Sequence, residues 1–354
     1  MDSCIPGRRA RARRSLGTCG LVLVLFATGL ARPQPIHACD ICAVYTATEQ
    51  REDKVGPRIG LATQYSHFGT IQQGGDEVPN PEGEYIDSVV SQFVLGYQLT
   101  PRIGLQLNVP IISRQYRRIE DGGRVRGNVS GFGDLSLLAD VLAYSMVTET
   151  SVFRFSLLGG LKLPSGNPSF LAEELDEDHH HGEAIVAHHS TGGGEPTHGA
   201  DHTSVPSAVH GHDLTLGSGS VDGIVGGSIF YSWNRAFISG AMQYAVRTEG
   251  AFDYQFANDL TWLGGPGYYV LLSHDSSVAL QAVVSGETKG NDTVNGEKTN
   301  DTGVTNLFVG PRIQFTWGTS LYAEGTFELP AVQNNTSRQI VADYRLRGAA
   351  VWRF

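Results

Sequence analysis

Apolar and polar residues alternate with a period of two along most of the chain from Arg58 onward. This is the period of a β-strand, in which successive side chains point to opposite faces. The clearest stretch ends the sequence, with apolar residues on one face and charges on the other: Ala342, Tyr344, Leu346, Ala350, Trp352 and Phe354 against Asp343, Arg345, Arg347 and Arg353. Such a pattern is typical of a strand between lipid and a polar interior.

Twelve stretches of this kind follow one another along the chain. Each is about as long as the 9–11 tilted residues that cross a bilayer as a β-strand. The predicted strands cover residues 58–67, 85–98, 102–113, 132–144, 152–163, 221–233, 236–248, 259–271, 277–286, 303–316, 320–330 and 341–354.

The connections between these stretches alternate in length. Short turns are expected after the even-numbered strands, at 99–101, 145–151, 234–235, 273–276 and 318–319. Long, polar, glycine-rich loops are expected after the odd-numbered strands, at 69–84, 114–131, 164–220, 249–258, 287–302 and 331–340. Outer-membrane barrels have short periplasmic turns and long external loops, so both chain ends are predicted to be periplasmic.

These patterns predict an all-β fold, a transmembrane antiparallel β-barrel of about 12 strands over residues 58–354. A soluble β-sandwich is the alternative, but it does not explain the strict alternation of connection lengths. Closing the sheet leaves no lipid-exposed edge with unpaired backbone groups. Membrane helices are not expected, because no segment after the first forty residues approaches the roughly 18 continuous apolar residues they need.

The first 38 residues are predicted to be an export signal. Arginines within 8–14 form a basic region, residues 20–31 form an apolar core, and residues 36–38 offer a cleavage site before Cys39. Cleavage leaves 20 basic and 35 acidic residues, which changes the formal net charge from −10 to −15. Such an acidic chain is not expected to bind nucleic acid, which requires clustered Lys and Arg.

Cys39 and Cys42 would then begin the mature chain, in a predicted periplasmic segment of residues 39–57. In an oxidising compartment, a Cys-x-x-Cys pair most often closes a local disulfide. Two thiolates can instead contribute to a soft-metal site, and lipidation of Cys39 is a third alternative. No histidine follows Cys42, so the pattern for covalent haem attachment is absent.

Three short glycine-rich motifs lie beside predicted strand ends: Gly-Phe-Gly-Asp-Leu at 131–135, Gly-Leu-Lys-Leu-Pro-Ser-Gly at 160–166 and Gly-Ser-Gly-Ser-Val-Asp at 217–222. With them, most of residues 55–354 resembles the outer-membrane transporter family linked to the phenol meta-cleavage pathway. The terminal Val-Trp-Arg-Phe at 351–354 resembles the signal by which the barrel-assembly machinery recognises its clients. The resemblance implies an outer-membrane barrel that transports solutes, and it implies no catalytic residues. Cys39/Cys42 and the length of loop 164–220 depart from the family pattern.

Nine of the twelve histidines lie within loop 164–220, namely His179, His180, His181, His188, His189, His198, His202, His210 and His212. Carboxylates accompany them, and this combination suits Zn²⁺, Ni²⁺ or Cu²⁺. The segment has few large apolar residues and contains three consecutive glycines at 192–194, so it is predicted to be a disordered external loop. Two interpretations stay open: a solvated insertion of biased composition, or a segment that captures transition-metal ions reversibly.

The inward faces of the predicted strands carry a polar and charged set: Arg58, Gln64, Gln106, Asn108, Asp134, Asp140, Arg154, Lys162, Arg312, Glu324, Glu328, Asp343, Arg345 and Arg347. These residues either pair across the lumen and close it or line a narrow pore. The two functional hypotheses are an outer-membrane channel for small solutes, modulated by metal ions at its external loop, and a metal-capturing surface protein without channel activity.

An enzyme is not expected. Barrel hydrolases need a nucleophile or an activated water beside a base. His67 and His274 have no recognisable serine or aspartate partner pattern in the sequence, and Gly-x-Ser-x-Gly is absent.

Overall fold

The computed structural model describes residues 55–120, 122–175 and 206–354. The predicted export signal and the Cys39/Cys42 pair lie outside the described residues, and the statements about them stay predictions.

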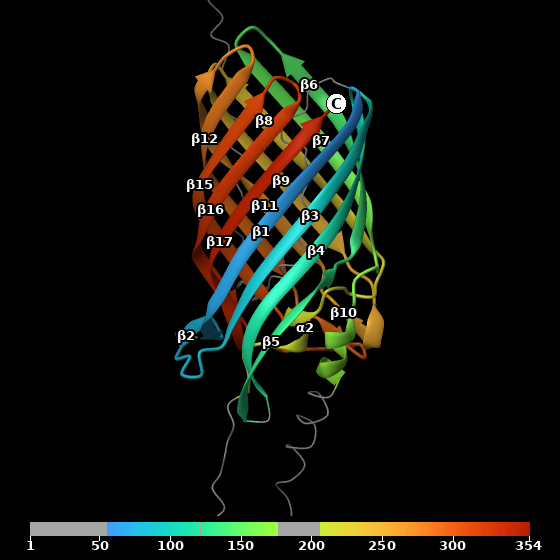
Figure 1. The fold of residues 1–354 in the computed structure, drawn as a ribbon, viewed down its shortest axis with the longest axis vertical. Coiled ribbons are helices and arrows are strands. Elements are labelled where there is room, and N and C mark those ends of the chain that lie inside the picture. The colour runs from blue at the N-terminus through green and yellow to red at the C-terminus, as the bar shows by residue number, and fades with distance from the viewer. Residues whose placement is uncertain (1–54, 121, 176–205) are drawn as a thin grey trace, which may run out of the picture. The chain divides into compact units, whose positions relative to one another are not determined.

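Twelve long antiparallel strands form a closed barrel over the described residues (Figure 1). Their bounds are β1 Gly56–Gln73, β3 Tyr85–Thr100, β4 Ile103–Glu120, β6 Leu135–Val147, β7 Ser151–Leu163, β8 Asp222–Trp233, β9 Ala236–Val246, β11 Asp259–Leu272, β12 Ser276–Lys289, β15 Val304–Trp317, β16 Leu321–Asn335 and β17 Arg338–Arg353. Each strand pairs with the next of these along the chain, and β17 pairs with β1 from Arg58↔Arg353 onward. The predicted fold class is therefore confirmed.

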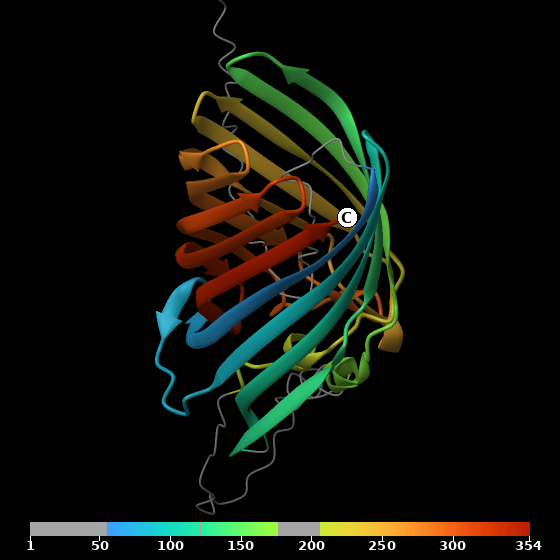
Figure 2. The same ribbon diagram turned by 45° about the horizontal axis from the view of Figure 1, so that its top comes forward.

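The short connections gather at one end of the barrel, together with the C-terminus, and the long ones gather at the other (Figures 1 and 2). The long-loop end carries β2 Asp76–Val78, β5 Gly123–Phe132, β10 Tyr254–Gln255, β13 Thr293–Val294 and β14 Glu297–Lys298. It also carries the short helices η2 Ser169–Leu171, α2 Gly211–Leu214 and η3 Ala251–Asp253. In the described part of the chain, no helix is long and apolar enough to cross a membrane.

Two predicted long loops are wrong. Residues 114–131 are mostly strand, because β4 continues to Glu120 and pairs with β5 in a hairpin. Residues 331–340 were expected to form an extended connection, but β16 and β17 leave only Thr336 and Ser337 between them. Ser337 takes a positive φ of 43°, which allows the chain to reverse tightly there. Both strands continue beyond the lipid-facing region, where outward side chains are polar and the alternation of apolar residues ends.

The outer surface of the barrel carries two sets of aromatic residues. One lies at the strand ends next to the short turns and is exposed: Tyr97, Tyr144, Tyr231, Trp233, Tyr268, Trp317, Trp352 and Phe354. A second lies farther toward the long-loop end: Tyr65, Tyr244, Trp262, Phe327 and Tyr344. Exposed aliphatic side chains fill the band between them, including Leu61, Leu95, Leu157, Leu280 and Ile313. An apolar band between two aromatic girdles is the surface that a bilayer requires.

Candidate functional site

The polar residues predicted to face inward form the wall of the lumen. Nine of them are buried: Arg58, Gln106, Asn108, Asp134, Asp140, Lys162, Arg312, Glu328 and Arg345. Asp343 does not face the lumen as predicted. Irregular pairing between β1 and β17 turns its carboxylate toward His67, and the Asp343 Oδ2 atom lies 3.6 Å from the His67 Nε2 atom. His67 lies on the strand face opposite the fully buried Ser66.

Oppositely charged side chains pair along this wall. Toward the short-turn end, Arg58 lies 3.3 Å from Asp140. In the middle of the barrel, three arginines each face a glutamate: Arg312 with Glu324 at 3.7 Å, Arg345 with Glu287 at 2.9 Å and Arg347 with Glu328 at 3.0 Å. The lumen is thus polar but locally neutralised, which fits the expectation of charges pairing across it.

A cavity of about 130 Å³ occupies the middle of the lumen. Its lining includes Gln64, Gln243, Arg312, Arg345 and Arg347, which come from β1, β9, β15 and β17. For scale, an apolar cavity of about 150 Å³ holds one benzene molecule. The chamber therefore has room for a solute of about one ring.

A second cavity of about 50 Å³ lies next to it. The two share Glu287 and Arg345, so this ion pair stands between them. The lining of the smaller cavity also includes His212 and Asp213 of α2. The path toward the long-loop end therefore meets the ion pair first and α2 after it.

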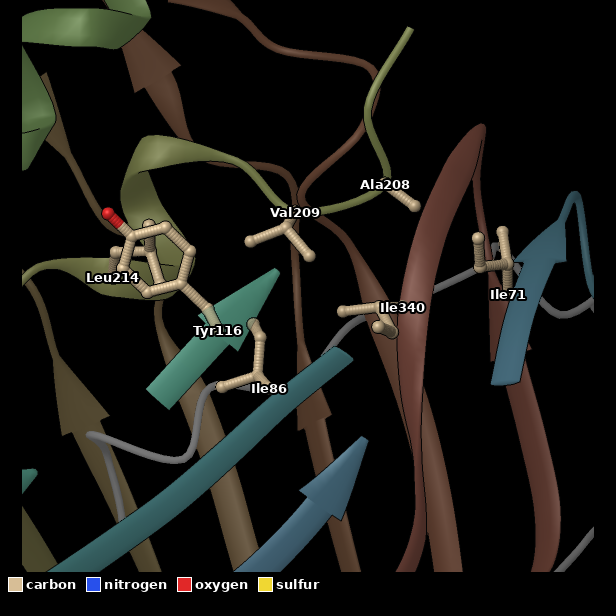
Figure 3. Close-up of a cluster of buried hydrophobic side chains, with 7 residues drawn as sticks. All are labelled: Ile71, Ile86, Tyr116, Ala208, Val209, Leu214 and Ile340. Atoms are coloured by element: carbon tan, nitrogen blue, oxygen red, sulfur yellow. The ribbon is translucent and has the colours of Figure 1, made fainter. Parts of the chain in front are cut away.

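Residues 164–175 and 206–220, here called the plug, fold against the barrel wall. Ala208, Val209 and Leu214 are at most 2% exposed and cluster with wall residues (Figure 3): Ile71, Ile86, Tyr116 and Ile340. Two further clusters hold Leu216 and Leu171 of the plug. The prediction of a disordered loop is therefore wrong for these two ends, because they bury their apolar residues against the barrel wall and the neighbouring long loops.

Polar contacts anchor the plug to several strands. Glu84, itself 1% exposed, accepts hydrogen bonds from the Ser207 hydroxyl at 2.5 Å and the Ala208 N–H at 3.0 Å. The Arg114 guanidinium donates to the Thr215 carbonyl, and Arg118 forms an ion pair with Glu173. Both halves of the plug are thus held by charged groups of the wall.

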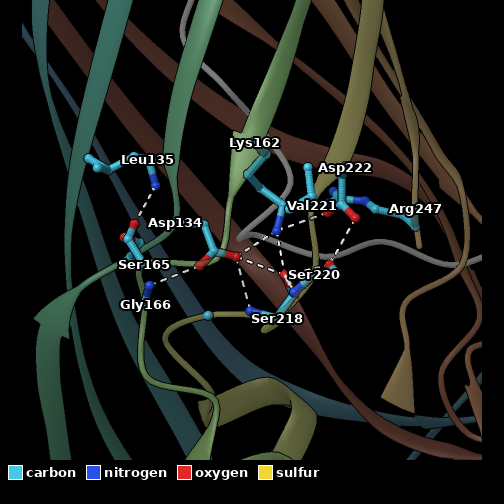
Figure 4. Close-up of polar contacts among 12 residues, drawn as sticks. Asp134, Leu135, Lys162, Ser165, Gly166, Ser218, Ser220, Val221, Asp222 and Arg247 are labelled. Atoms are coloured by element: carbon cyan, nitrogen blue, oxygen red, sulfur yellow. Dashed lines mark hydrogen bonds and ion pairs between the residues drawn. The ribbon is translucent and has the colours of Figure 1, made fainter. Parts of the chain in front are cut away.

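The three glycine-rich motifs meet in one buried network (Figure 4). Asp134 of the first motif accepts hydrogen bonds from the Gly166 N–H of the second at 2.9 Å and from the Ser218 N–H of the third at 3.0 Å. Lys162 lies 2.5 Å from Asp134 and 2.9 Å from Asp222. One lysine therefore joins the motifs at the point where the plug leaves and rejoins the barrel.

The network continues through Arg247, which pairs with Asp222 at 2.9 Å and Asp259 at 2.6 Å. Glycine is required at the junction, because a Cβ on Gly166 would lie 2.8 Å from the Gly217 Cα. The two ends of the plug are therefore in backbone contact.

Of the nine predicted metal-binding histidines, only His210 and His212 belong to the described residues; His179, His180, His181, His188, His189, His198 and His202 lie outside them. His210 and His212 are buried in the plug and their rings stack at a centroid distance of 5.3 Å. They lie beside Asp213, and one potential ligand atom from each of the three side chains lies within 4.8 Å of the other two. Asp213 was not among the candidate ligands expected from the sequence, although its place directly after His212 could have suggested it.

The buried Glu174 carboxylate faces these histidines. Burial alone would raise its pKa, but His212 and His210 outweigh burial and lower the pKa of Glu174 to about 2. Burial likewise lowers the pKa of the His212 imidazole, but Asp213 and Glu174 reverse this and raise that pKa well above its usual value. The carboxylates around the two imidazoles therefore stabilise a positive charge at this position.

The other histidines named in the enzyme hypothesis lie elsewhere. On the outer surface, His67 forms a hydrogen bond with Asp87 at 2.7 Å, and its ring lies tilted beside the Tyr344 ring at a centroid distance of 5.6 Å. His274 pairs with the adjacent Asp275 in an exposed turn at the short-turn end. The sequence pattern did not reveal the Asp87 partner, because it comes from the neighbouring strand.

Comparison with solved structures supports the fold. An outer-membrane channel from Pseudomonas putida F1 matches with a TM-score of 0.54 at 14% sequence identity, over 88% of this chain and 100% of that chain. The β domain of the Bordetella autotransporter BrkA matches with a TM-score of 0.39 at 10% identity, over 85% and 100%, which is too remote to support an argument. No protein-family model matches the sequence, and a search of curated proteins found no relative.

The chain therefore has the fold of a Gram-negative outer-membrane β-barrel, the architecture that the family resemblance implied. Its own form is a twelve-stranded barrel with an ion-paired lumen and a folded plug at the long-loop mouth.

Proposed function

We propose that the protein is an outer-membrane channel for small solutes, with the plug closing the long-loop mouth. The observation that carries this proposal is the central cavity of about 130 Å³ inside a closed, polar-lined barrel. Its ion-paired walls can offer both donors and acceptors to a passing solute. The Glu287–Arg345 pair and the plug limit passage in the described conformation.

In this proposal the short turns and both chain ends face the periplasm, and the long loops face outward, as the loop asymmetry predicts. The barrel-assembly machinery is the expected partner during biogenesis. The exposed Trp352 at the end of β17 and Phe354 directly after the strand support this, because they match the terminal pattern of such clients.

Conductance across planar bilayers tests the channel. Because Gly166 and Gly217 are in contact, residues 167–216 can be deleted and the chain rejoined without stretching the barrel. The deletion is expected to give a steady conductance several-fold above that of the full chain. Replacing only residues 176–205 with a short Gly-Ser linker is the control, and it should leave conductance unchanged because both halves of the plug remain.

If the plug deletion folds but conducts no more than the full chain, even when it also carries Glu287→Ala to open the ion pair, the barrel is not a channel. Folding can be checked by the faster gel migration of an unheated barrel. That result would favour the second candidate, a surface protein that captures Zn²⁺, Ni²⁺ or Cu²⁺ through its histidine-rich segment. The proximity of His210, His212 and Asp213, whose potential ligand atoms lie within 4.8 Å of one another, supports such metal capture.

A further inference from the structure

We infer that the plug contains a built site for one transition-metal ion, formed by His210, His212 and Asp213. This inference rests on the proposed metal capture and not on the channel. It places a defined site inside the barrel mouth, apart from the seven histidines between 179 and 202.

The ligand atoms are almost at coordination spacing. The His212 Nε2 atom lies 3.5 Å from the Asp213 Oδ1 atom, and the His210 Nδ1 atom lies 3.9 Å from the Asp213 Oδ2 atom. In a tetrahedral Zn²⁺ site with bonds of about 2.0–2.1 Å, neighbouring ligand atoms are roughly 3.3–3.4 Å apart. One atom from each of the three side chains lies within 4.8 Å of the others, and the two rings stack at 15°, so enclosing an ion requires a rotation of the imidazoles that brings both lone pairs to one point, with water completing the shell.

Glu174 orients His212 for this role. Its carboxylate lies 3.0 Å from the His212 Nδ1 atom and also accepts the His212 backbone N–H at 2.6 Å. An Nδ1–H donated to Glu174 leaves the Nε2 lone pair directed toward Asp213. Metal-bound histidines almost always make such a second hydrogen bond, which fixes the ring and raises its basicity.

His210 supplies an independent observation. Its side chain is only 8% exposed, yet its Nδ1 atom has no hydrogen-bond partner. A buried polar atom without a partner is costly and calls for an explanation. A metal ion beside Asp213 would satisfy this nitrogen.

The surrounding charge favours a cation. Asp301 places a carboxylate oxygen 3.8 Å from the His210 Nε2 atom, so three carboxylates surround the two imidazoles: Glu174, Asp213 and Asp301. The 50 Å³ cavity that reaches His212 and Asp213 provides access.

The test measures Zn²⁺ binding by calorimetry, and Co²⁺ binding by its visible absorption, on the folded full chain. His210→Gln and Asp213→Asn remove ligands while keeping a polar side chain of similar size. The matched control replaces the seven histidines between 179 and 202 with asparagine. We expect one tight site that persists in this control and weakens at least 100-fold in both ligand variants.

Glu174→Gln tests the positioning role, and 10–100-fold weaker binding is expected. If a ligand substitution disturbs the fold of the plug, Glu174→Gln still tests the built site, because it leaves all three ligands in place. If tight binding is lost in the seven-histidine control but kept in the ligand and Glu174 variants, metal capture stands and the built site does not. If the full chain binds no Zn²⁺ or Co²⁺, both proposals are wrong.

Discussion

Lys162 is the buried cation that holds the two ends of the plug to the barrel. It is 3% exposed and contacts both Asp134 and Asp222. Because removing one partner of a buried ion pair leaves the other charge without compensation, such changes cost about 3–5 kcal/mol. Lys162→Met is therefore expected to lower the free energy of unfolding by this amount, measured by urea titration of the barrel in detergent.

Lys298→Met is the matched control, because Lys298 is exposed on β14 and its loss should change stability by less than about 0.5 kcal/mol. Equal stability of the two variants would show that Arg247 alone compensates Asp222, and the assigned role of Lys162 would be wrong.

The plug is an element whose fold depends on the wall. Leu214 of α2 is fully buried among wall residues including Ile86 and Tyr116. Leu214→Ala leaves a cavity there and should weaken docking by at least about 2 kcal/mol, or roughly 30-fold in the population of the undocked plug. The barrel itself should stay folded, because its ladder of strand pairs is untouched.

Limited proteolysis measures this effect, since cleavage tracks the open population when reclosing is fast. Cleavage in the plug should accelerate about 30-fold while the migration of the unheated barrel stays constant. Leu280→Ala, on the lipid-facing surface of β12, is the control and should leave the rate unchanged. Unaltered cleavage in Leu214→Ala would mean that the polar anchors alone hold the plug.

The positions of the barrel strands could be predicted from the sequence, but their lengths were predicted less well. All twelve predicted strands exist, yet β4 extends to Glu120 and pairs with β5 beyond the lipid band. Outward residues there, such as Arg117 and Arg124, do not face lipid, so the apolar half of the alternation is missing and the sequence signal stops early.

For the whole molecule, the apolar exterior between the aromatic girdles predicts where a charge is tolerated. Leu157 is 49% exposed near the middle of that band on β7. Arginine at the midplane of a barrel's lipid face costs about 2–4 kcal/mol. Leu157→Arg is therefore expected to destabilise the folded barrel in lipid vesicles by this amount, measured by denaturant titration.

Gln115→Arg is the matched control, because Gln115 is exposed on β4 beyond the band and pairs with the uncharged Asn128. Its effect should stay within about 0.5 kcal/mol. A similar loss of stability in both variants would contradict the assigned position of the membrane.

The sequence alone determined the twelve barrel strands and, except at the irregular pairing beside Asp343, which residues face lipid or lumen, because the face of each strand residue depends on its position in a local two-residue repeat. It also marked the histidines and the glycine-rich motifs as unusual. Only the tertiary structure decided that Asp134 meets Ser218, that Glu174 meets His212 and that Leu214 closes onto Tyr116. Those contacts join residues far apart in the chain. They form because barrel closure brings the wall strands around the plug, and the plug alone has too few apolar residues to bury its own.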